Sequence, residues 1–164
     1  MRTLFTAVRA ILYAAGFVLL WGWLASIARR YDGPLGLEPP RGSEAAGILL
    51  MIPGALVVLA CVGVFLVRGR GTAAPFDPPV LFVASGPYRY VRNPMYLGAA
   101  LVLAGYGLFE KSVSIVLLSA VFLLVMHLFV LLVEEPGLER RFGESYLAYK
   151  RGTNRWLPRP RPPS

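Results

Sequence analysis

The sequence predicts an all-α, polytopic membrane protein with four transmembrane helices followed by a cytosolic, C-terminal amphipathic helix. Two observations support this prediction. The chain is 56% hydrophobic and 16% charged, with a mean hydropathy of +0.58, which is too apolar for an ordinary water-soluble domain. The apolar residues also gather in four stretches, 10–28, 45–67, 94–109 and 113–133. With 164 residues, the chain is interpreted as a single membrane domain, 1–164.

The first, second and fourth stretches are long enough to span a hydrocarbon core of roughly 30 Å. The third stretch is shorter, because a helix rising about 1.5 Å per residue covers only about 24 Å over 94–109. It spans only if its loop-side end dips into the bilayer or the membrane thins there. We interpret the first stretch as a retained anchor, since it exceeds a signal-peptide core in length and Arg29 and Arg30 end it.

The basic residues indicate the orientation of the chain. The net charge is +8. If the N-terminus is inside, most of the lysine and arginine residues fall on the inner side of the membrane. The outer side then holds only Arg29, Arg30, Arg41 and Lys111. We therefore expect both termini to be cytoplasmic, in a membrane of the bacterial inner-membrane type. Because the charges lie in loops and tails between apolar runs, we expect no nucleic-acid partner.

The polar segments differ in character. The outer loop that begins at Tyr31 is rich in Gly and Pro and reads as irregular. The tail from Pro136 is expected to form one amphipathic helix on the inner membrane surface, because its apolar residues recur at helical spacing. These residues are Leu138, Phe142, Tyr146 and Tyr149. Trp156 is expected at the membrane interface, and the proline-rich end, 158–164, is expected to be disordered.

The stretch "GPYRYVRNPMYLG", residues 86–98, stands where the inner loop meets the third helix. Asn93 followed by Pro94 is a helix-start signal, in which Asn caps the helix and Pro fills its first position. The free N–H groups of that helix end favour anionic groups, and Arg89 and Arg92 strengthen the preference. The sequence therefore predicts an anion site at the inner end of the third helix.

A cation site is predicted beside it. The turn "EKS" is short, so the third and fourth helices form an antiparallel hairpin whose two inner ends meet. The fourth helix ends at Glu134 and Glu135, which add negative charge to the negative end of its dipole. Two adjacent carboxylates there require a cation or hydrogen-bond donors. A zwitterionic ligand with an added positive charge would suit the paired inner ends of these two helices.

Structural alternatives stay open for the same residues. Arg89 and Arg92 also fit topology residues that reach lipid headgroups, and the two glutamates also fit ion pairs with Arg140 or Arg141. Further residues have plain structural interpretations. Tyr88, Tyr90 and Tyr96 fit an aromatic belt, His127 a packed or hydrogen-bonded helix residue, Cys61 a buried hydrophobe, and Gly98, Gly105 and Gly107 close helix packing. With one cysteine and one histidine, no metal site is expected.

Three motifs together resemble a known family. "GPYRYVRNPMYLG", then "EEPGLERRFGESYLAYKR" after the hairpin, then "RWLPR", are similar to the integral-membrane methyltransferases. That group includes the isoprenylcysteine carboxyl methyltransferase family and the phospholipid methyltransferase family. The resemblance covers roughly residues 72–160, the expected methyltransferase core.

The resemblance implies S-adenosylmethionine as the methyl donor and a membrane-embedded transfer to a lipophilic acceptor. It implies donor contacts from Val80, Leu81, Phe82, Val83, Tyr88, Asn93, Pro94, Met95, Tyr96, Glu134 and Glu135. The residues expected in or beside the catalytic centre are Arg89, Arg92, Asn93 and Glu135. An in-line methyl displacement needs alignment of its reacting atoms more than acid or base help. An amine acceptor would release a proton to Glu135 or to water.

The acceptor stays open between a prenylcysteine carboxylate and a phospholipid amine. The prenylcysteine enzymes have His where this chain has Asn93, and a substrate-binding Arg where it has Val130, whereas "FGESYLAYKR" is closer to their branch. Other acceptors, such as a small thiol or another isoprenoid, are not excluded by the motifs. The alternative from another class is a non-catalytic small membrane protein that binds lipid or scaffolds partners. The sequence does not indicate an oligomeric state.

Overall fold

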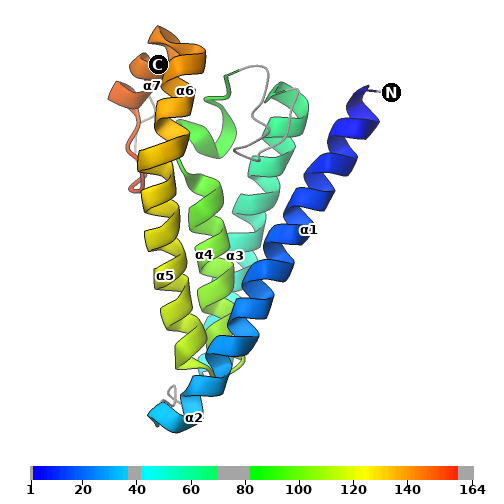
Figure 1. Cartoon of the computed structure of the whole chain (residues 1–164), viewed down its shortest axis with the longest axis vertical. Helices are drawn as coiled ribbons and strands as arrows, with labels where there is room; N and C mark the ends of the chain where they lie inside the picture. Colours follow the sequence, from blue (N-terminus) through cyan, green and yellow to red (C-terminus); the bar gives the residue numbers. More distant parts are fainter. Residues whose placement is uncertain (1, 37–41, 70–81, 159–164) are drawn as a thin grey trace.

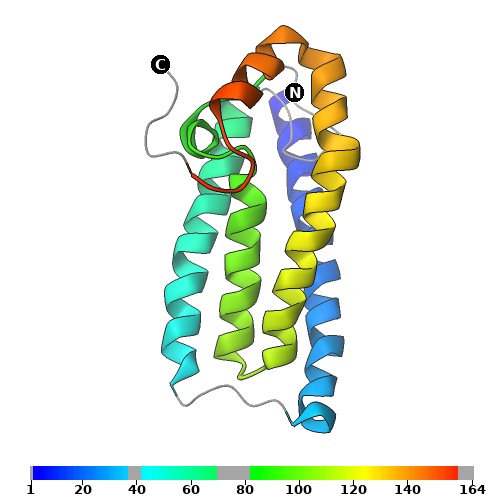
Figure 2. The same cartoon turned by 90° about the vertical axis from the view of Figure 1, so that its left-hand side faces the viewer.

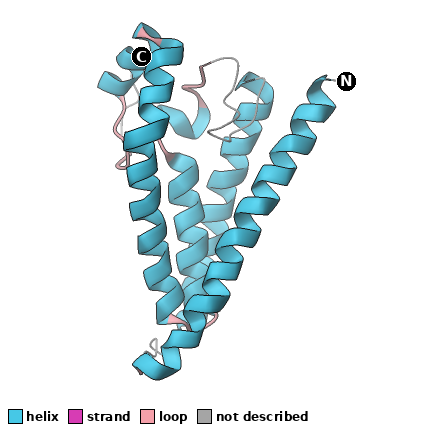
Figure 3. Cartoon of the chain, viewed as in Figure 1, coloured by secondary structure: helices cyan, strands magenta, loops and turns pink. Residues whose placement is uncertain are grey.

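The computed structural model describes residues 2–36, 42–69 and 82–158. The described residues contain helices and loops and no strand (Figure 3). Val80, Leu81 and the chain end at 159–164 lie outside them, so the expectations for those positions stay predictions.

Four long helices form an elongated bundle (Figure 1). They are α1 (Arg2–Ala28), α3 (Ser43–Val64), α4 (Pro94–Phe109) and α5 (Val113–Phe129). Helix α1 contacts α5 through Phe17 and Trp21, whose rings meet the edge of Phe122 at centroid distances of 5.8 and 4.7 Å. Toward its N-terminal start, α1 leans away from the other three helices (Figure 1).

Three helical segments are long and apolar enough to cross a membrane, namely Ile11–Leu35, Ser43–Val67 and Val113–Phe142. They coincide with the first, second and fourth predicted spans and support an integral membrane protein. Helix α4 is apolar but has only 16 residues, so its crossing stays a prediction. Its length is limited by Pro94 at one end and by the tight turn at Glu110 and Lys111 at the other.

Helices α3 and α4 are pressed together along a seam of glycines. A Cβ atom on Gly47 would lie 2.6 Å from the carbonyl oxygen of Gly105, and one on Gly54 would lie 2.7 Å from that of Gly98. Such distances leave no room for a side chain, so the absence of Cβ lets the two backbones touch. The predicted packing role of Gly98 and Gly105 is confirmed, and Gly107 has the same role against Val116 of α5.

The end of the bundle opposite the chain termini differs from the prediction. The segment expected to be irregular begins with a short helix, α2 (Asp32–Leu35). Asp32 Oδ1 accepts a hydrogen bond of 2.8 Å from the backbone N–H of Ser114 in the first turn of α5. A free helical N–H favours a carboxylate, which explains why this segment is ordered against the bundle.

The fourth helix does not end at the glutamate pair. Helix α5 passes through a π-helical turn, η4 (Val130–Glu134), directly into α6 (Glu135–Phe142), as Figure 2 shows. The wider turn accommodates Pro136, which cannot donate a backbone hydrogen bond. The expected helix end at residue 133 was therefore wrong, and Glu134 and Glu135 lie within a continuous helical segment rather than at a negative dipole end.

The tail forms two short helices instead of one. Helix α6 stops at Phe142, and α7 (Glu144–Gly152) starts after Gly143, whose φ is 52° and ψ is −130°. Those dihedrals lie far from the helical region and strongly favour glycine. The break turns α7 back across the end of the bundle (Figure 2). The single amphipathic helix expected here is thus corrected to two short helices joined by a turn at Gly143.

Candidate functional site

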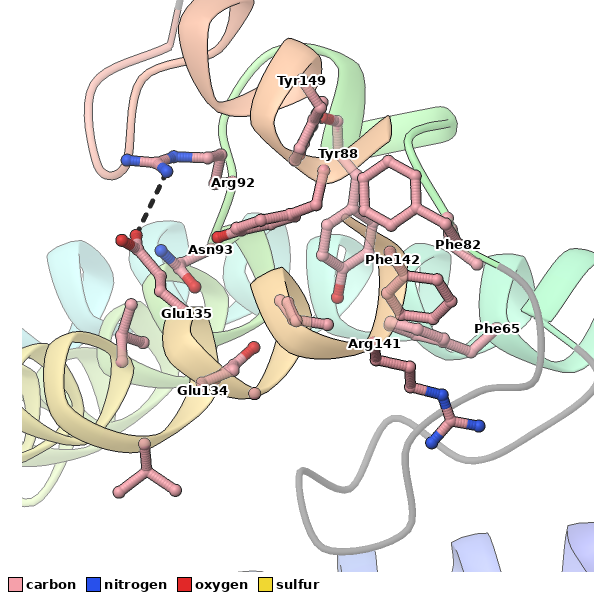
Figure 4. Close-up of a pocket in the computed structure, with 16 residues that line it drawn as sticks. Phe65, Phe82, Tyr88, Arg92, Asn93, Glu134, Glu135, Arg141, Phe142 and Tyr149 are labelled. Atoms are coloured by element: carbon pink, nitrogen blue, oxygen red, sulfur yellow. Dashed lines mark hydrogen bonds and ion pairs between the residues drawn. The ribbon is translucent and has the colours of Figure 1, made fainter. Parts of the chain in front are cut away.

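The candidate site is a cavity of about 240 Å³ at the end of the bundle where the start of α1 and helix α7 lie. Its walls come from the segment 82–93, the junction of α5 and α6, and helices α6 and α7 (Figure 4). The residues that line it are Phe65, Phe82, Val83, Tyr88, Arg92, Asn93, Val130, Val133, Glu134, Glu135, Gly137, Leu138, Arg141, Phe142, Tyr146 and Tyr149.

One side of the cavity is aromatic. Phe82 packs against Phe142, Tyr146 and Tyr149, with ring centroids 5.4, 5.9 and 5.2 Å apart. Tyr88 meets Phe65 of the turn after α3 edge-on at 5.3 Å. The tail helices are therefore held to the inner loop by ring contacts that also make the wall of the cavity. Such a wall excludes water and offers π faces to a flat or cationic ligand.

The segment that carries Tyr88 is fixed by a glycine turn. Gly86 has φ of 61°, and a Cβ there would lie 2.7 Å from Cγ2 of Val64. The turn η3 (Gly86–Arg89) then places Tyr88 in a buried cluster with Cys61 and Val83. Met95 of α4 packs against the same cluster. The predicted burial of Cys61 is confirmed, and its surroundings show it as part of the wall behind Tyr88.

Glu135 is enclosed by cations. Its carboxylate accepts two hydrogen bonds from Arg155, at 2.8 Å from Nε and 2.9 Å from Nη2. Nη1 of Arg92 lies 3.2 Å away, as the dashed line in Figure 4 marks, and Nζ of Lys150 lies 3.3 Å away. Glu135 is only 4% exposed, so these groups replace the water that the carboxylate loses on burial.

Glu134 is partnered differently. Its Oε2 accepts one hydrogen bond of 2.9 Å from the hydroxyl of Tyr96, and no cationic side chain of the described residues is within ion-pair distance. Glu134 also lines the cavity. Two neighbouring carboxylates thus have different environments, because Glu135 is paired with three cations whereas Glu134 has a tyrosine hydroxyl and no cationic partner among the described residues.

A short C-terminal segment, residues Thr153–Trp156, crosses the site, and we call it the strap. Its backbone carbonyls at Asn154 and Arg155 accept hydrogen bonds from the N–H of Arg92, at 2.9 Å, and from Nδ2 of Asn93, at 3.2 Å. Helix α7, just before the strap, adds a 2.6 Å bond from the Tyr149 hydroxyl to the carbonyl of Tyr88. The strap therefore joins the segment before α4 to the tail.

The strap also reaches α5. The indole N–H of Trp156 donates to Nδ1 of His127 at 2.9 Å. This bond confirms that His127 is a hydrogen-bonded helix residue. It also gives Trp156 a definite partner, where the sequence suggested a membrane-interface anchor.

These contacts shift the pKa values of titratable groups in the segments that are predicted to face the cytosol. Burial, with the nearby charge of Glu135, raises the pKa of Tyr146 to about 12, and burial raises the pKa of Tyr88 and of Tyr149 above its usual value. The site tyrosines are therefore neutral hydroxyls at physiological pH. The pKa of Arg155 is raised by the hydrogen bonds that its guanidinium donates to Glu135. That guanidinium stays charged under all ordinary conditions.

The structure brings together most of the predicted site residues. Seven of them line the cavity, namely Phe82, Val83, Tyr88, Arg92, Asn93, Glu134 and Glu135. Tyr96 joins them through Glu134, whereas Pro94 and Met95 lie behind the wall. Arg89 is exposed and does not line the cavity. Asn93 precedes Pro94 as predicted, but its side chain does not cap α4, because its amide bonds to the strap instead.

Several lining residues were missed as site residues. The sequence analysis assigned Phe142, Tyr146 and Tyr149 to an amphipathic face, because their helical spacing is the signal of any half-buried helix. The pairing of Arg155 with Glu135 was not predicted, since this contact spans 20 residues and depends on the turn at Gly143. Arg141, over the ring of Phe142 at 5.6 Å, lines the cavity rather than pairing with a glutamate.

The fold and the site together define a helical integral membrane protein with an aromatic cavity that contains an unneutralised carboxylate. A model of the phospholipid methyltransferase family matches residues 43–145, and the chain belongs to this family. The predicted membership of the integral-membrane methyltransferases is thereby confirmed. The match begins at α3, a helix that the motif resemblance did not reach, and it ends before the strap.

A relative among curated proteins is an uncharacterised protein of Haemophilus influenzae. It is 36% identical over 63 residues, which are 38% of this chain and 100% of that protein. No solved structure matches the chain significantly.

Proposed function

We propose that the protein is an integral-membrane methyltransferase that moves a methyl group from S-adenosylmethionine to a lipophilic acceptor. The family supports methyl transfer in a membrane. We further propose that it resides in a bacterial inner membrane with both termini cytoplasmic, so that the donor enters from the cytosol. The start of α1 and helix α7 lie at the same end of the bundle, which agrees with this orientation (Figure 1).

The observation that carries the proposal is the unneutralised carboxylate of Glu134 in an aromatic cavity. S-adenosylmethionine supplies, when bound, a methyl group on a positively charged sulfur. A buried carboxylate without a cationic partner and adjacent π faces are suited to such a charge. The residues present therefore fit the donor. We assign Glu134, Tyr88, Phe82 and Val83 to its binding, with Tyr96 holding the Glu134 carboxylate.

Catalysis by this chain is proposed to consist of alignment and exclusion of water. The wall of Phe82 and the tail aromatics keeps water from the site, and Arg92 and Asn93 hold the segment before α4 in place. A carboxylate engaged by three cations is a poor proton acceptor, so we assign Glu135 to positioning and the proton of an amine acceptor to water. Arg89, which lies outside the cavity, is assigned to headgroup contact.

Of the two acceptor classes, a phospholipid amine is favoured over a prenylcysteine carboxylate. Val130 is 1% exposed and lines the cavity at the position where the prenylcysteine enzymes have a substrate-binding arginine. An apolar side chain there gives a carboxylate no partner. The family description points to the same acceptor class.

The test is binding of S-adenosylmethionine to the full chain in lipid nanodiscs, measured by calorimetry. Glu134→Gln should lose binding, whereas Glu144→Gln, which removes an exposed carboxylate of α7 outside the cavity, should bind like the wild type. Methyl transfer would then be assayed with phosphatidylethanolamine and with a prenylcysteine. A folded wild type that binds no S-adenosylmethionine would contradict the proposal and favour the non-catalytic lipid-binding alternative.

A further inference from the structure

The strap is bonded to three separate parts of the site, namely the segment before α4, helix α6 and helix α5. It accepts bonds from Arg92 and Asn93 before α4, it holds Glu135 of α6 through Arg155, and it reaches His127 of α5 through Trp156. These contacts join positions 20 to 62 residues apart in the chain. The strap lies beyond residues 43–145, the range that the family model matches.

The contacts of the strap give the two adjacent glutamates different partners. Arg155 makes a two-bond fork to Glu135, a geometry that fixes both carboxylate oxygens. Arg92, whose side chain is 9% exposed, has no other carboxylate partner among the described residues and depends on the same group. Glu135 thus has no oxygen left for a ligand, whereas Glu134 of the same helical turn has, among the described residues, only the Tyr96 hydroxyl as a partner.

We propose that the strap is a positioning element of the donor site, in which Arg155 neutralises and fixes Glu135 so that Glu134 alone presents negative charge to the donor. The inference rests on the proposed function for the identity of the donor. Arg155 contacts no ligand in this proposal and acts through Glu135. Trp156 fixes the same segment to α5.

The charge difference between two ligands tests the proposal. S-adenosylmethionine carries one more positive charge than its product, S-adenosylhomocysteine, and the two molecules otherwise share their shape. The ratio of their dissociation constants therefore reports the electrostatic potential at the sulfur, whereas a general loosening of the fold weakens both ligands together. Both constants are to be measured by calorimetry on the full chain in nanodiscs.

Arg155→Gln should raise the preference for S-adenosylmethionine over S-adenosylhomocysteine. Loss of one positive charge near the site should change the ratio about twofold to tenfold, depending on the distance and the local dielectric. The double variant Arg155→Gln with Glu135→Gln removes both charges and should return the ratio to the wild-type value. Glu134→Gln should remove most of the preference.

Arg151→Gln is the matched control, because it removes an exposed arginine of α7 that makes no ion pair with Glu135. It should leave both constants and their ratio unchanged. Arg155→Lys keeps the charge but cannot make the two-bond fork, so both ligands should weaken about fivefold at an unchanged ratio. If Arg155→Gln fails to fold, the loss of preference expected in Glu134→Gln still tests which carboxylate faces the donor.

Either of two results would overturn this inference while leaving the proposed function intact. One is a ratio in Arg155→Gln equal to that of the wild type, and the other is wild-type affinity for both ligands in Arg155→Lys. A folded wild type that binds neither ligand would overturn the proposed function and this inference with it. Circular dichroism of each variant in the same nanodiscs shows that the helices are retained.

Discussion

At the scale of single residues, neighbouring side chains of the same kind have different tasks. Glu134 and Glu135 are adjacent in sequence, but a helix turns about 100° per residue, so their carboxylates point to different surroundings. Glu135 meets Arg92, Lys150 and Arg155, and Glu134 meets Tyr96. The residue type therefore does not determine the role of each glutamate, whereas the side chains around it do.

The ion pairs of Glu135 should contribute to stability. Glu135→Gln leaves the buried Arg92 without a carboxylate, and we expect the free energy of unfolding to fall by about 3 kcal/mol, as for other broken buried pairs. The measurement is an SDS unfolding titration followed by circular dichroism.

Glu139→Gln serves as the comparison for that prediction. Among the described residues Glu139 pairs with Lys150 alone, and its side chain is 37% exposed, so its loss should cost less than about 1 kcal/mol. Equal losses in the two variants would contradict the idea that burial makes Glu135 the structural anchor of the tail.

At the scale of elements, the backbones of α3 and α4 are in contact, and their side chains are arranged around that contact. Gly105→Val should disrupt the pair, because its Cβ alone would lie 2.6 Å from the carbonyl oxygen of Gly47. Overpacking against backbone costs about 1–3 kcal/mol or more. Unfolding in SDS is the readout.

The control for the glycine seam is Gly63→Ala on α3, the partner helix of α4, where a Cβ meets nothing within 4 Å. It should be neutral or stabilise the protein by up to about 1 kcal/mol, since Ala is the better helix former. A destabilisation by Gly63→Ala as large as that of Gly105→Val would refute a specific seam.

The break between α6 and α7 should depend on Gly143. Its φ of 52° and ψ of −130° are costly for any residue with a Cβ, so Gly143→Ala should destabilise the tail by about 1–3 kcal/mol. Limited proteolysis after α6 should become faster. If Gly143→Ala were as resistant as the wild type, the turn would not need glycine.

At the scale of the whole molecule, the site lies at one end of the bundle and the polar contacts of Asp32, Ser43 and Lys111 lie at the other. Three apolar helical segments, each long enough to cross a membrane, lie between the two ends. The proposed methyl donor would therefore meet the protein at one membrane surface.

The orientation can be tested by labelling. In a Cys61→Ser background, Arg30→Cys and Ser145→Cys place exposed thiols at opposite ends of the molecule. In intact bacterial cells whose outer membrane has been permeabilised, an impermeant maleimide should label Arg30→Cys and should reach Ser145→Cys only after lysis. Labelling of Ser145→Cys alone in unlysed cells would reverse the predicted topology.

Several features were predictable from the sequence because they depend on local patterns. Apolar length gave three spans, Asn93–Pro94 gave the start of α4, and the short turn gave the α4–α5 hairpin. The three motifs before and after that hairpin indicated the family. Each of these follows from composition or spacing over a few residues, since hydrophobic length and helix-start chemistry act locally.

Other features were decided only by tertiary structure. The passage of α5 into α6 through a π-helical turn, the use of Asn93 to hold the strap, and the fork from Arg155 to Glu135 all depend on contacts between distant segments. Residue types alone determine that a glutamate pair near a membrane requires cations or hydrogen-bond donors. Which glutamate receives them depends on where the Gly143 turn directs the chain, because electrostatic partners are set by distance in space rather than in sequence.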